Sequence, residues 1–309
     1  MHRRVKDWII LLALVFSFAQ SYSQATGYAQ SNGVNIYYQT VGEGTPILVI
    51  NGGPGFSSEG FLTIAEEIAS FECQAILYDQ RGTGKSEMTV IDSSTVTMDL
   101  MVQDMEALRT KLGLDSWILF GHSFGGMMAN YYASKHPEHV SAIIHSSSGG
   151  VDLFLLENAR ENLYARLSPE EIDSLTYWRQ RYTESELEED RRRYNHYLAT
   201  AYVYHETHVP LVTERLLLGN LTLNRLVWTD MRRINYDCKS SLRSFHQPVL
   251  ILQGGQDVIP KEVGLRAKDV FSNSELVFLD ECGHYGWLDQ KEAYLSEIQS
   301  FLKKLEKGH

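Results

Sequence analysis

Short apolar segments alternate along the chain with longer amphipathic ones. The apolar runs resemble strands buried on both faces of a sheet, and they span 46–50, 73–78, 117–120, 140–145, 248–253 and 275–279. Apolar residues recur at helical spacing in segments between and after them, notably 57–70, 95–112, 124–135 and 292–305. This alternation predicts an α/β fold, a mostly parallel sheet with flanking helices. Residues 33–40 alternate like an additional edge strand.

The segment 150–243 interrupts this rhythm and predicts a helical cap insertion. Ser168, Pro169 and Glu171 are the residue types that begin a helix with a capping box, and Thr183-x-x-Glu186 repeats that pattern. We expect the cap to cover the carboxyl edge of the sheet, where open α/β sheets bind ligands. The α/β core is then divided into residues 24–149 and 244–309.

Residues 1–23 have the pattern of a signal peptide. Arg3, Arg4 and Lys6 precede an apolar run over 8–19, and small and polar residues follow. The alternative is a membrane anchor, but this run rises only about 18 Å as a helix, too short for a hydrocarbon core of ~30 Å. We therefore expect an exported protein, periplasmic or secreted, without a stable membrane anchor after cleavage.

Charge and cysteine usage exclude several classes of partner. The net charge of −11 and the lack of a basic stripe argue against nucleic acid. Cys73, Cys238 and Cys282 lack the Cys-x-x-Cys spacing of metal sites and are expected to be buried free thiols. We expect no metal and no cofactor.

The clearest chemical motif is the pentapeptide 121–125, Gly-His-Ser-Phe-Gly. It follows the strand 117–120 and opens a helix, which is the setting of a nucleophile on a sharp strand-to-helix turn. Glycines at both ends remove side chains that would collide in such a turn. The helix N-terminus favours the negative charge that develops beside Ser123.

A serine nucleophile needs a base, and the chain offers one in the expected order of serine, acid and histidine. Asp257 follows the strand 248–253, and His284 follows the strand 275–279, so both reach the same sheet edge as Ser123. Asp280 and Glu281 are rival acids, but they lie beside His284 in sequence and are better explained as loop charges.

Residues 51–55, Asn-Gly-Gly-Pro-Gly, follow the strand 46–50. Glycines let the backbone approach a ligand closely, so a main-chain N–H can point at an oxyanion. The expected pair of donors is the N–H of Gly53 with that of Phe124. A simple turn before a helix is the alternative explanation for these glycines.

Together these segments resemble the α/β-hydrolase superfamily and, within it, the proline iminopeptidase-like group. The resemblance rests on NGGPG at 51–55, DQRGTGKS at 79–86, GHSFGG at 121–126, QGGQDVIP at 253–260 and ECGHYGWLDQ at 281–290. It implies that Ser123, Asp257 and His284 form the catalytic triad and that Gly53 and Phe124 form the oxyanion hole. It also implies that Asp79 and Arg81 form an internal ion pair.

The resemblance implies a serine hydrolase that cleaves an ester or amide bond through an acyl-enzyme, on a small-molecule or short-peptide substrate. One branch is removal of an N-terminal proline, for which Glu206 and Glu214 are candidates to hold the substrate ammonium group. The other is carboxylesterase or lactonase action on a small apolar substrate. This chain departs from the family at Asn51, where relatives typically have His, and in its generic elbow sequence. A non-catalytic binding protein on the same scaffold is the alternative of another class. The sequence specifies no oligomeric state.

Overall fold

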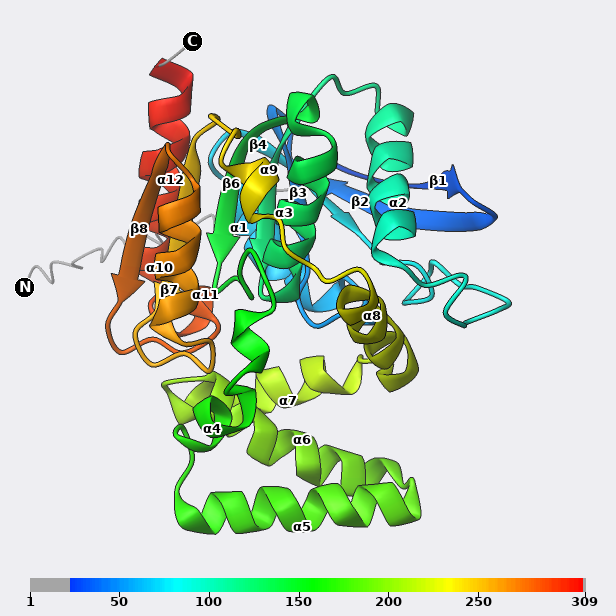
Figure 1. Ribbon diagram of the computed structural model, residues 1–309, viewed down its shortest axis with the longest axis vertical. Helices are drawn as coiled ribbons and strands as arrows, with labels where there is room; N and C mark the ends of the chain where they lie inside the picture. The colour runs from blue at the N-terminus through cyan, green and yellow to red at the C-terminus, as the bar shows by residue number, and fades with distance from the viewer. Residues whose placement is uncertain (1–22, 308–309) are drawn as a thin grey trace, which may run out of the picture.

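The computed structural model describes residues 23–307, in which eight strands form one mixed sheet (Figure 1). The order across the sheet is β1-β2-β4-β3-β5-β6-β7-β8. Antiparallel pairing is confined to β1 with β2 and β2 with β4, and every later neighbour is parallel. The strands are β1 Gln24–Ser31, β2 Val34–Val41, β3 Thr45–Ile50, β4 Cys73–Tyr78, β5 Trp117–His122, β6 Val140–Ser146, β7 Val249–Gly254 and β8 Ser274–Leu279. The predicted α/β class is confirmed.

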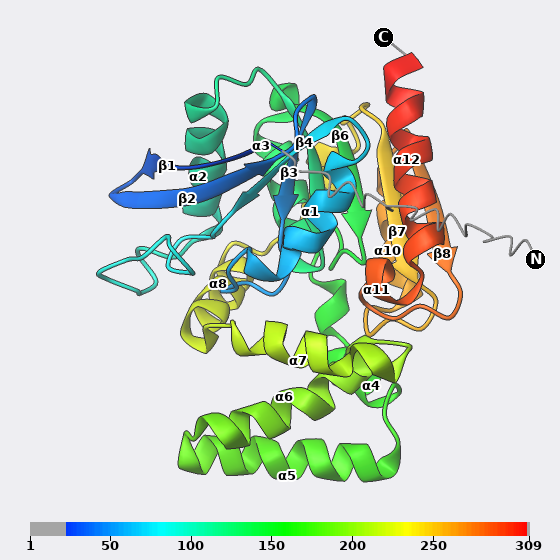
Figure 2. The same ribbon diagram turned by 180° about the vertical axis from the view of Figure 1, so that it is seen from behind.

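Helices cover both faces of the sheet because the central strands are apolar on both sides. The apolar cluster of one face joins α2 (Met98–Lys111), α3 (Phe124–Lys135) and α10 (Lys261–Val270) to alternate strand residues. The cluster of the other face joins α1 (Leu62–Ala69), which follows the short helix η1 (Glu59–Phe61), and α12 (Lys291–Lys307). The two sides are seen in Figures 1 and 2.

One edge of the sheet differs from the prediction. The predicted edge strand is β2, but β1 pairs along its whole length and takes the edge position. Asn32 and Gly33 join the two strands with positive φ angles of 44° and 79°, the conformation of a tight hairpin turn. The strand β1 carries few apolar residues, so its sequence gives no periodic signal. The predicted signal peptide lies almost entirely outside the described residues.

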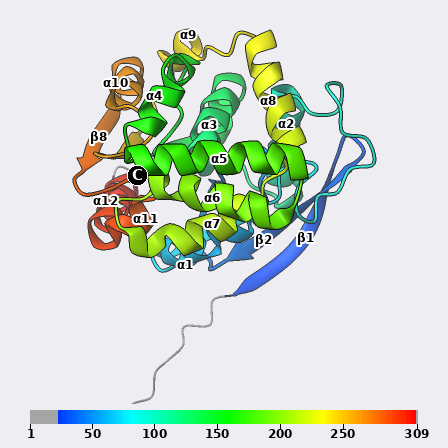
Figure 3. The ribbon, with the colours of Figure 1, turned by 90° about the horizontal axis from the view of Figure 1, so that it is seen from below.

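The segment between β6 and β7 is helical, and its part over residues 159–217 lies across the carboxyl ends of the strands (Figures 1 and 3). Residues 239–242 at its end pack beside α3, on one face of the sheet. The Ser168 capping box is confirmed at the start of α5. The second box is wrong, because Thr183 lies inside α5, where its hydroxyl donates to the Arg179 carbonyl, and Glu186 ends that helix. The elements are η3 Phe154–Leu156, α4 Ala159–Tyr164, α5 Pro169–Ser185, α6 Glu188–Tyr202, η4 Glu206–His208, α7 Val209–Leu217, α8 Leu221–Arg233 and α9 Lys239–Leu242.

The segment 79–86 is structural, but its ion pair is not the one expected. Arg81 forms a bidentate pair with Asp104 of α2, with N···O distances of 2.7 and 2.6 Å, and both side chains are almost fully buried. Asp79 instead accepts hydrogen bonds from the N–H of Lys85 and from the N–H and hydroxyl of Ser58. Because the Asp79 carboxylate already accepts three hydrogen bonds, it does not need a cation, and Asp79 and Arg81 do not pair.

All three cysteines are buried and unpaired, as expected for free thiols. Burial raises the pKa of Cys73 and of Cys238 to about 11, and it raises the pKa of Cys282 further. Within residues 23–307, no helix has the length and apolarity needed to cross a membrane.

Candidate active site

Ser123 lies on a strained turn between β5 and α3. Its φ and ψ of 56° and −120° are unusual for a residue with a side chain, as a nucleophile elbow requires. The turn is held because the Ser123 N–H donates to the Ser146 carbonyl of β6 at 3.0 Å. A Cβ on Gly125 would lie 2.0 Å from the Ile50 carbonyl oxygen, so this position accepts only glycine.

His284 and Asp257 are hydrogen-bonded at the same sheet edge. The distance from His284 Nδ1 to Asp257 Oδ1 is 2.8 Å, and the two side chains are 2 % and 0 % exposed. The same carboxylate oxygen accepts the N–H of Ile259 at 3.0 Å, which fixes its orientation. The rival acids Asp280 and Glu281 are exposed. The structure thus brings Asp257, rather than a loop charge, against the imidazole.

The loop that carries His284 is anchored by a buried carboxylate that sequence reasoning missed. Asp289, in the short helix α11 (Gly286–Asp289), accepts the N–H groups of Gly283, Tyr204 and His205 at 2.9 to 3.0 Å. The His284 N–H donates to the Tyr202 carbonyl at 2.7 Å. These bonds join the end of cap helix α6 to the histidine loop.

The loop 51–55 lies against the elbow. A Cβ on Gly52 would lie 2.8 Å from the Ser123 Cβ, so the loop backbone and the nucleophile are in close contact. Gly53 has a φ of 61°. Phe124 is the first residue of α3, where N–H groups have no acceptor within the helix. Asn51 donates to the Phe56 carbonyl at 3.0 Å and so braces the loop.

Ser123 and His284 line one cavity of about 190 Å³ beneath the cap. Glu206 and Glu214 do not reach it: both are exposed, and Glu214 instead pairs with Arg192. The described residues that line it are Gly52, Gly53, Phe56, His122, Ser123, Tyr194, Asn195, Leu198, Tyr202, Arg215, Leu216, Leu221, Asn224, His284 and Tyr285. The set contains no Asp or Glu.

His122 precedes the nucleophile and is a neutral ring inside an aromatic cluster. Its ring centroid lies 4.6 Å from that of His284 and 4.8 Å from that of Trp287. Burial lowers the pKa of His122 well below its usual value, and charge on His284 and Arg215 lowers it further. His122 therefore supports the His284 ring without competing with it for a proton at neutral pH.

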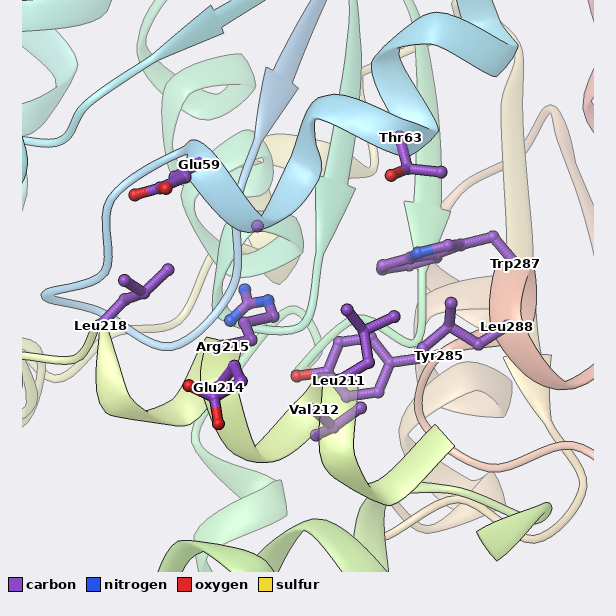
Figure 4. A pocket seen from close by; sticks show the side chains of 11 residues that line it. Glu59, Thr63, Leu211, Val212, Glu214, Arg215, Leu218, Tyr285, Trp287 and Leu288 are labelled. Atoms are coloured by element: carbon purple, nitrogen blue, oxygen red, sulfur yellow. The ribbon is translucent and has the colours of Figure 1, made fainter. Parts of the chain in front are cut away.

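A second cavity, of about 400 Å³, lies on the other side of Arg215 and Tyr285, which line both cavities. Figure 4 shows the Arg215 guanidinium between helix α7 and the segment that carries Glu59, with Tyr285 beside it. Leu211, Leu218 and Leu288 contribute apolar surface to this second cavity. Arg215 and Asn195 were not recognised from the sequence, because neither belongs to a motif: Asn195 lies in a polar helix and Arg215 is a single cation in a mostly apolar one.

One cluster has the residue types of a metal site. Glu106, His136 and His139 place their ligand atoms within 4.8 Å of one another, and none of the three lines the Ser123 cavity. The Glu106 carboxylate is already bound by Arg109 and Tyr132. Burial alone would raise the pKa of Glu106, but these hydrogen bonds outweigh it and hold the value at about 2.

Comparison with known proteins identifies the fold family. The family model described as the alpha/beta hydrolase fold matches residues 45–290. The proline iminopeptidase of Lactobacillus helveticus is 26% identical over 87% of this chain and 95% of its own length. Among solved structures, an esterase from Exiguobacterium antarcticum has a TM-score of 0.71 at 20% identity, covering 90% of this chain and 100% of its own. A proline iminopeptidase from Mycobacterium smegmatis has a TM-score of 0.68 at 18% identity, covering 92% and 99%.

The matched span begins at β3 and ends just after α11, so it contains the elbow, the cap and the histidine loop. Both relatives named as proline iminopeptidases are covered over nearly their whole length. The chain belongs to the alpha/beta hydrolase fold family and is similar to the proline iminopeptidases within it.

Proposed function

We propose that the protein is a serine hydrolase that cleaves an ester or amide bond through an acyl-enzyme on Ser123. The observation that carries the proposal is the shared cavity. Ser123 on its strained turn and His284, paired at 2.8 Å with the buried Asp257, line the same cavity of about 190 Å³. A nucleophile, a base and an acid that orients the base are the parts that acyl transfer needs.

In the proposed reaction, His284 Nε2 takes the hydroxyl proton while Ser123 Oγ attacks the substrate carbonyl carbon. Asp257 keeps the second imidazole proton on Nδ1, so Nε2 presents its lone pair. The N–H groups of Gly53 and Phe124 stabilise the tetrahedral oxyanion. His284 then protonates the departing alcohol or amine. Water, activated by the same histidine, attacks the acyl carbonyl and releases the acid and Ser123.

The substrate has two candidate classes, each with its own support. Similarity to proline iminopeptidases favours a short peptide with an N-terminal proline. The lining of the cavity favours an ester, because among the described residues around it no carboxylate is present to hold a substrate ammonium group. Glu206 and Glu214, the residues considered for that task, are exposed.

Labelling with a fluorophosphonate probe tests the nucleophile. We expect the wild type to be labelled, Ser123→Ala to lose labelling, and Ser134→Ala, a control on the same helix, to retain it. Absence of labelling in a folded wild type, or labelling that survives Ser123→Ala, contradicts the proposal.

A substrate panel separates the two branches. Turnover of prolyl arylamides supports the peptidase branch. Hydrolysis of short esters without turnover of any aminoacyl arylamide supports the esterase branch and excludes the peptidase.

Residues 1–23 support a second part of the proposal, export to the periplasm or the medium. Fractionation of expressing cells and the mass of the mature chain test it. Recovery of the unprocessed chain in the cytoplasm contradicts it.

The acidic net charge of −11 further supports a small-molecule or short-peptide substrate rather than nucleic acid.

A further inference from the structure

Arg215 places a buried cation in the wall of the Ser123 cavity. It lies in α7, is only 8 % exposed, and lines the cavity of Ser123. Its guanidinium carbon lies 4.5 Å from the ring centroid of Phe61, 5.2 Å from that of Phe56 and 5.7 Å from that of Tyr285. Such stacking offsets part of the cost of burying the charge, but rings offer no lone pair in reach of the N–H edges.

The cation has no carboxylate partner. Within residues 23–307, no acidic side chain lies at ion-pair distance from Arg215, and the neighbouring Glu214 pairs with Arg192 instead. Within residues 23–307, the long contact of 3.5 Å from Nη2 to the Gly52 carbonyl is the single hydrogen bond that the Arg215 side chain makes. Its Nε–H is buried and has no acceptor among the described residues. A buried charge is costly unless it is paired, so this arrangement calls for an explanation.

Asn195 provides a second donor without a partner at the same cavity. It lies in α6 and is 5 % exposed, and its buried side-chain Nδ2 finds no acceptor in the part of the chain that the structure describes. The two cap helices thus each place a buried, unsatisfied donor against the cavity that holds Ser123. Unsatisfied donors without a matching acidic residue favour a ligand that brings acceptors and negative charge.

We infer that Arg215, with Asn195, binds a carboxylate carried by the substrate, so that the enzyme acts on anionic esters or amides. The inference rests on the proposed function and assigns the substrate class of that same site. A guanidinium presents paired N–H donors that match a carboxylate, which makes it more selective than a point charge. The position of Arg215 between the two cavities allows the carboxylate to belong either to the acyl group or to the leaving group.

Two pairs of substrates test the inference and distinguish these sources. For the acyl side, the mono-4-nitrophenyl ester of adipate is compared with its neutral amide, 4-nitrophenyl adipamate. For the leaving-group side, 4-carboxyphenyl acetate is compared with 4-carbamoylphenyl acetate. In each pair the members have nearly the same size and differ in charge. We expect the wild type to prefer the anionic member of one pair by about ten- to hundredfold in kcat/KM, the range of a charge-assisted hydrogen bond.

Variants test whether Arg215 causes the preference for the anionic substrate. In Arg215→Met the ratio of kcat/KM for the anionic over the neutral member should fall at least about tenfold, and Arg215→Lys should retain part of it. Asn195→Leu should lower the ratio less. Arg192→Met, an exposed cap arginine that pairs with Glu214, is the matched control and should retain the wild-type ratio.

Binding without turnover gives an independent readout. Adipate should raise the melting temperature of the wild type and of Arg192→Met, but not that of Arg215→Met, and the diamide of adipate should raise none of them. If Arg215→Met does not fold, the wild-type preference, the Lys variant and the adipate shift still decide the question.

Three results overturn the inference: equal turnover of both members of both pairs, equal loss on both members in Arg215→Met, and no stabilisation of the wild type by adipate. Equal loss identifies Arg215 as structural. These failures differ from failure of the proposed function, in which the wild type is neither labelled by a fluorophosphonate nor active on any ester.

Discussion

Arg81 in the core and Arg215 in the cap are both buried, but their guanidinium groups meet different surroundings. Arg81 is clamped by both oxygens of Asp104 and by the carbonyls of Thr95 and Leu100. The Arg215 guanidinium stacks on aromatic rings and donates a single long hydrogen bond within the described residues. The core satisfies its charge internally, as a scaffold must. The cap leaves hydrogen-bond donors without acceptors in the wall of the Ser123 cavity, which is what a substrate site needs.

The largest effect is expected in the core, at Asp257. In Asp257→Asn the negative charge that stabilises the His284 imidazolium is lost, and an amide that turns its NH2 toward Nδ1 favours the wrong tautomer. We expect kcat to fall about 10⁴-fold, the scale seen for this change in other triads, with the fold intact. Steady-state kinetics and circular dichroism measure the two quantities. An active Asp257→Asn variant shifts the role of acid to another residue, for which Asp280→Asn and Glu281→Gln are the controls.

The second prediction contrasts the two arginine sites directly through stability. Asp104→Asn leaves the Arg81 charge buried without its counter-ion and should cost about 3–5 kcal/mol in the free energy of unfolding. Arg215→Met removes a buried charge that lacks a carboxylate and should be neutral or stabilising. Urea unfolding of both variants measures the difference. Equal losses in the free energy of unfolding of the two variants would contradict the proposed difference between the two arginine sites.

The third prediction concerns His145, a buried histidine of the core. Burial lowers the pKa of His145 to about 3, while an unfolded histidine takes up its proton near pH 6.5. Below pH 6.5 the unfolded state therefore binds more protons, and stability falls as the pH is lowered toward 3, by about 1.4 kcal/mol per pH unit for this group. His145→Gln should flatten that dependence. Unfolding at pH 7, 6 and 5 measures it, and an unchanged slope contradicts the burial of a neutral ring.

The smallest effect belongs to the outer cap. Ser168 caps α5 and forms a reciprocal pair with Glu171. Ser168→Ala should cost about 1 kcal/mol. Hydrogen exchange distinguishes where that loss falls. Faster exchange confined to α5 shows that the cap opens independently of the sheet, and a uniform change shows that the two unfold together.

The parts of the molecule that sequence reasoning recovers are those with local signals. The strands are apolar on both faces, and the elbow joins a strand to a helix through glycines, so both are recognisable without tertiary information. Asp257 and His284 follow from chain order, because residues that come after parallel strands reach one edge. Their 2.8 Å hydrogen bond is then a consequence of topology.

What sequence reasoning missed depends on contacts between distant segments. The partner of Arg81 is Asp104, 23 residues away on another element, and nothing near either residue marks the pair. The strand β1 is defined by pairing with β2 rather than by its own polar sequence. Arg215 and Glu214 are neighbours in one helix, and only packing decides that Arg215 points inward while Glu214 stays at the surface.

Because its three cysteines are buried, the fold is insensitive to thiol–disulfide exchange. A thiol exchanges disulfides as its thiolate, and burial holds the pKa of Cys73 and Cys238 at about 11, so almost none of either ionises at neutral pH. Cys282 is fully buried beside the histidine loop and is even less acidic. The fold therefore has no disulfide to reduce, and its three thiols are shielded from disulfide exchange.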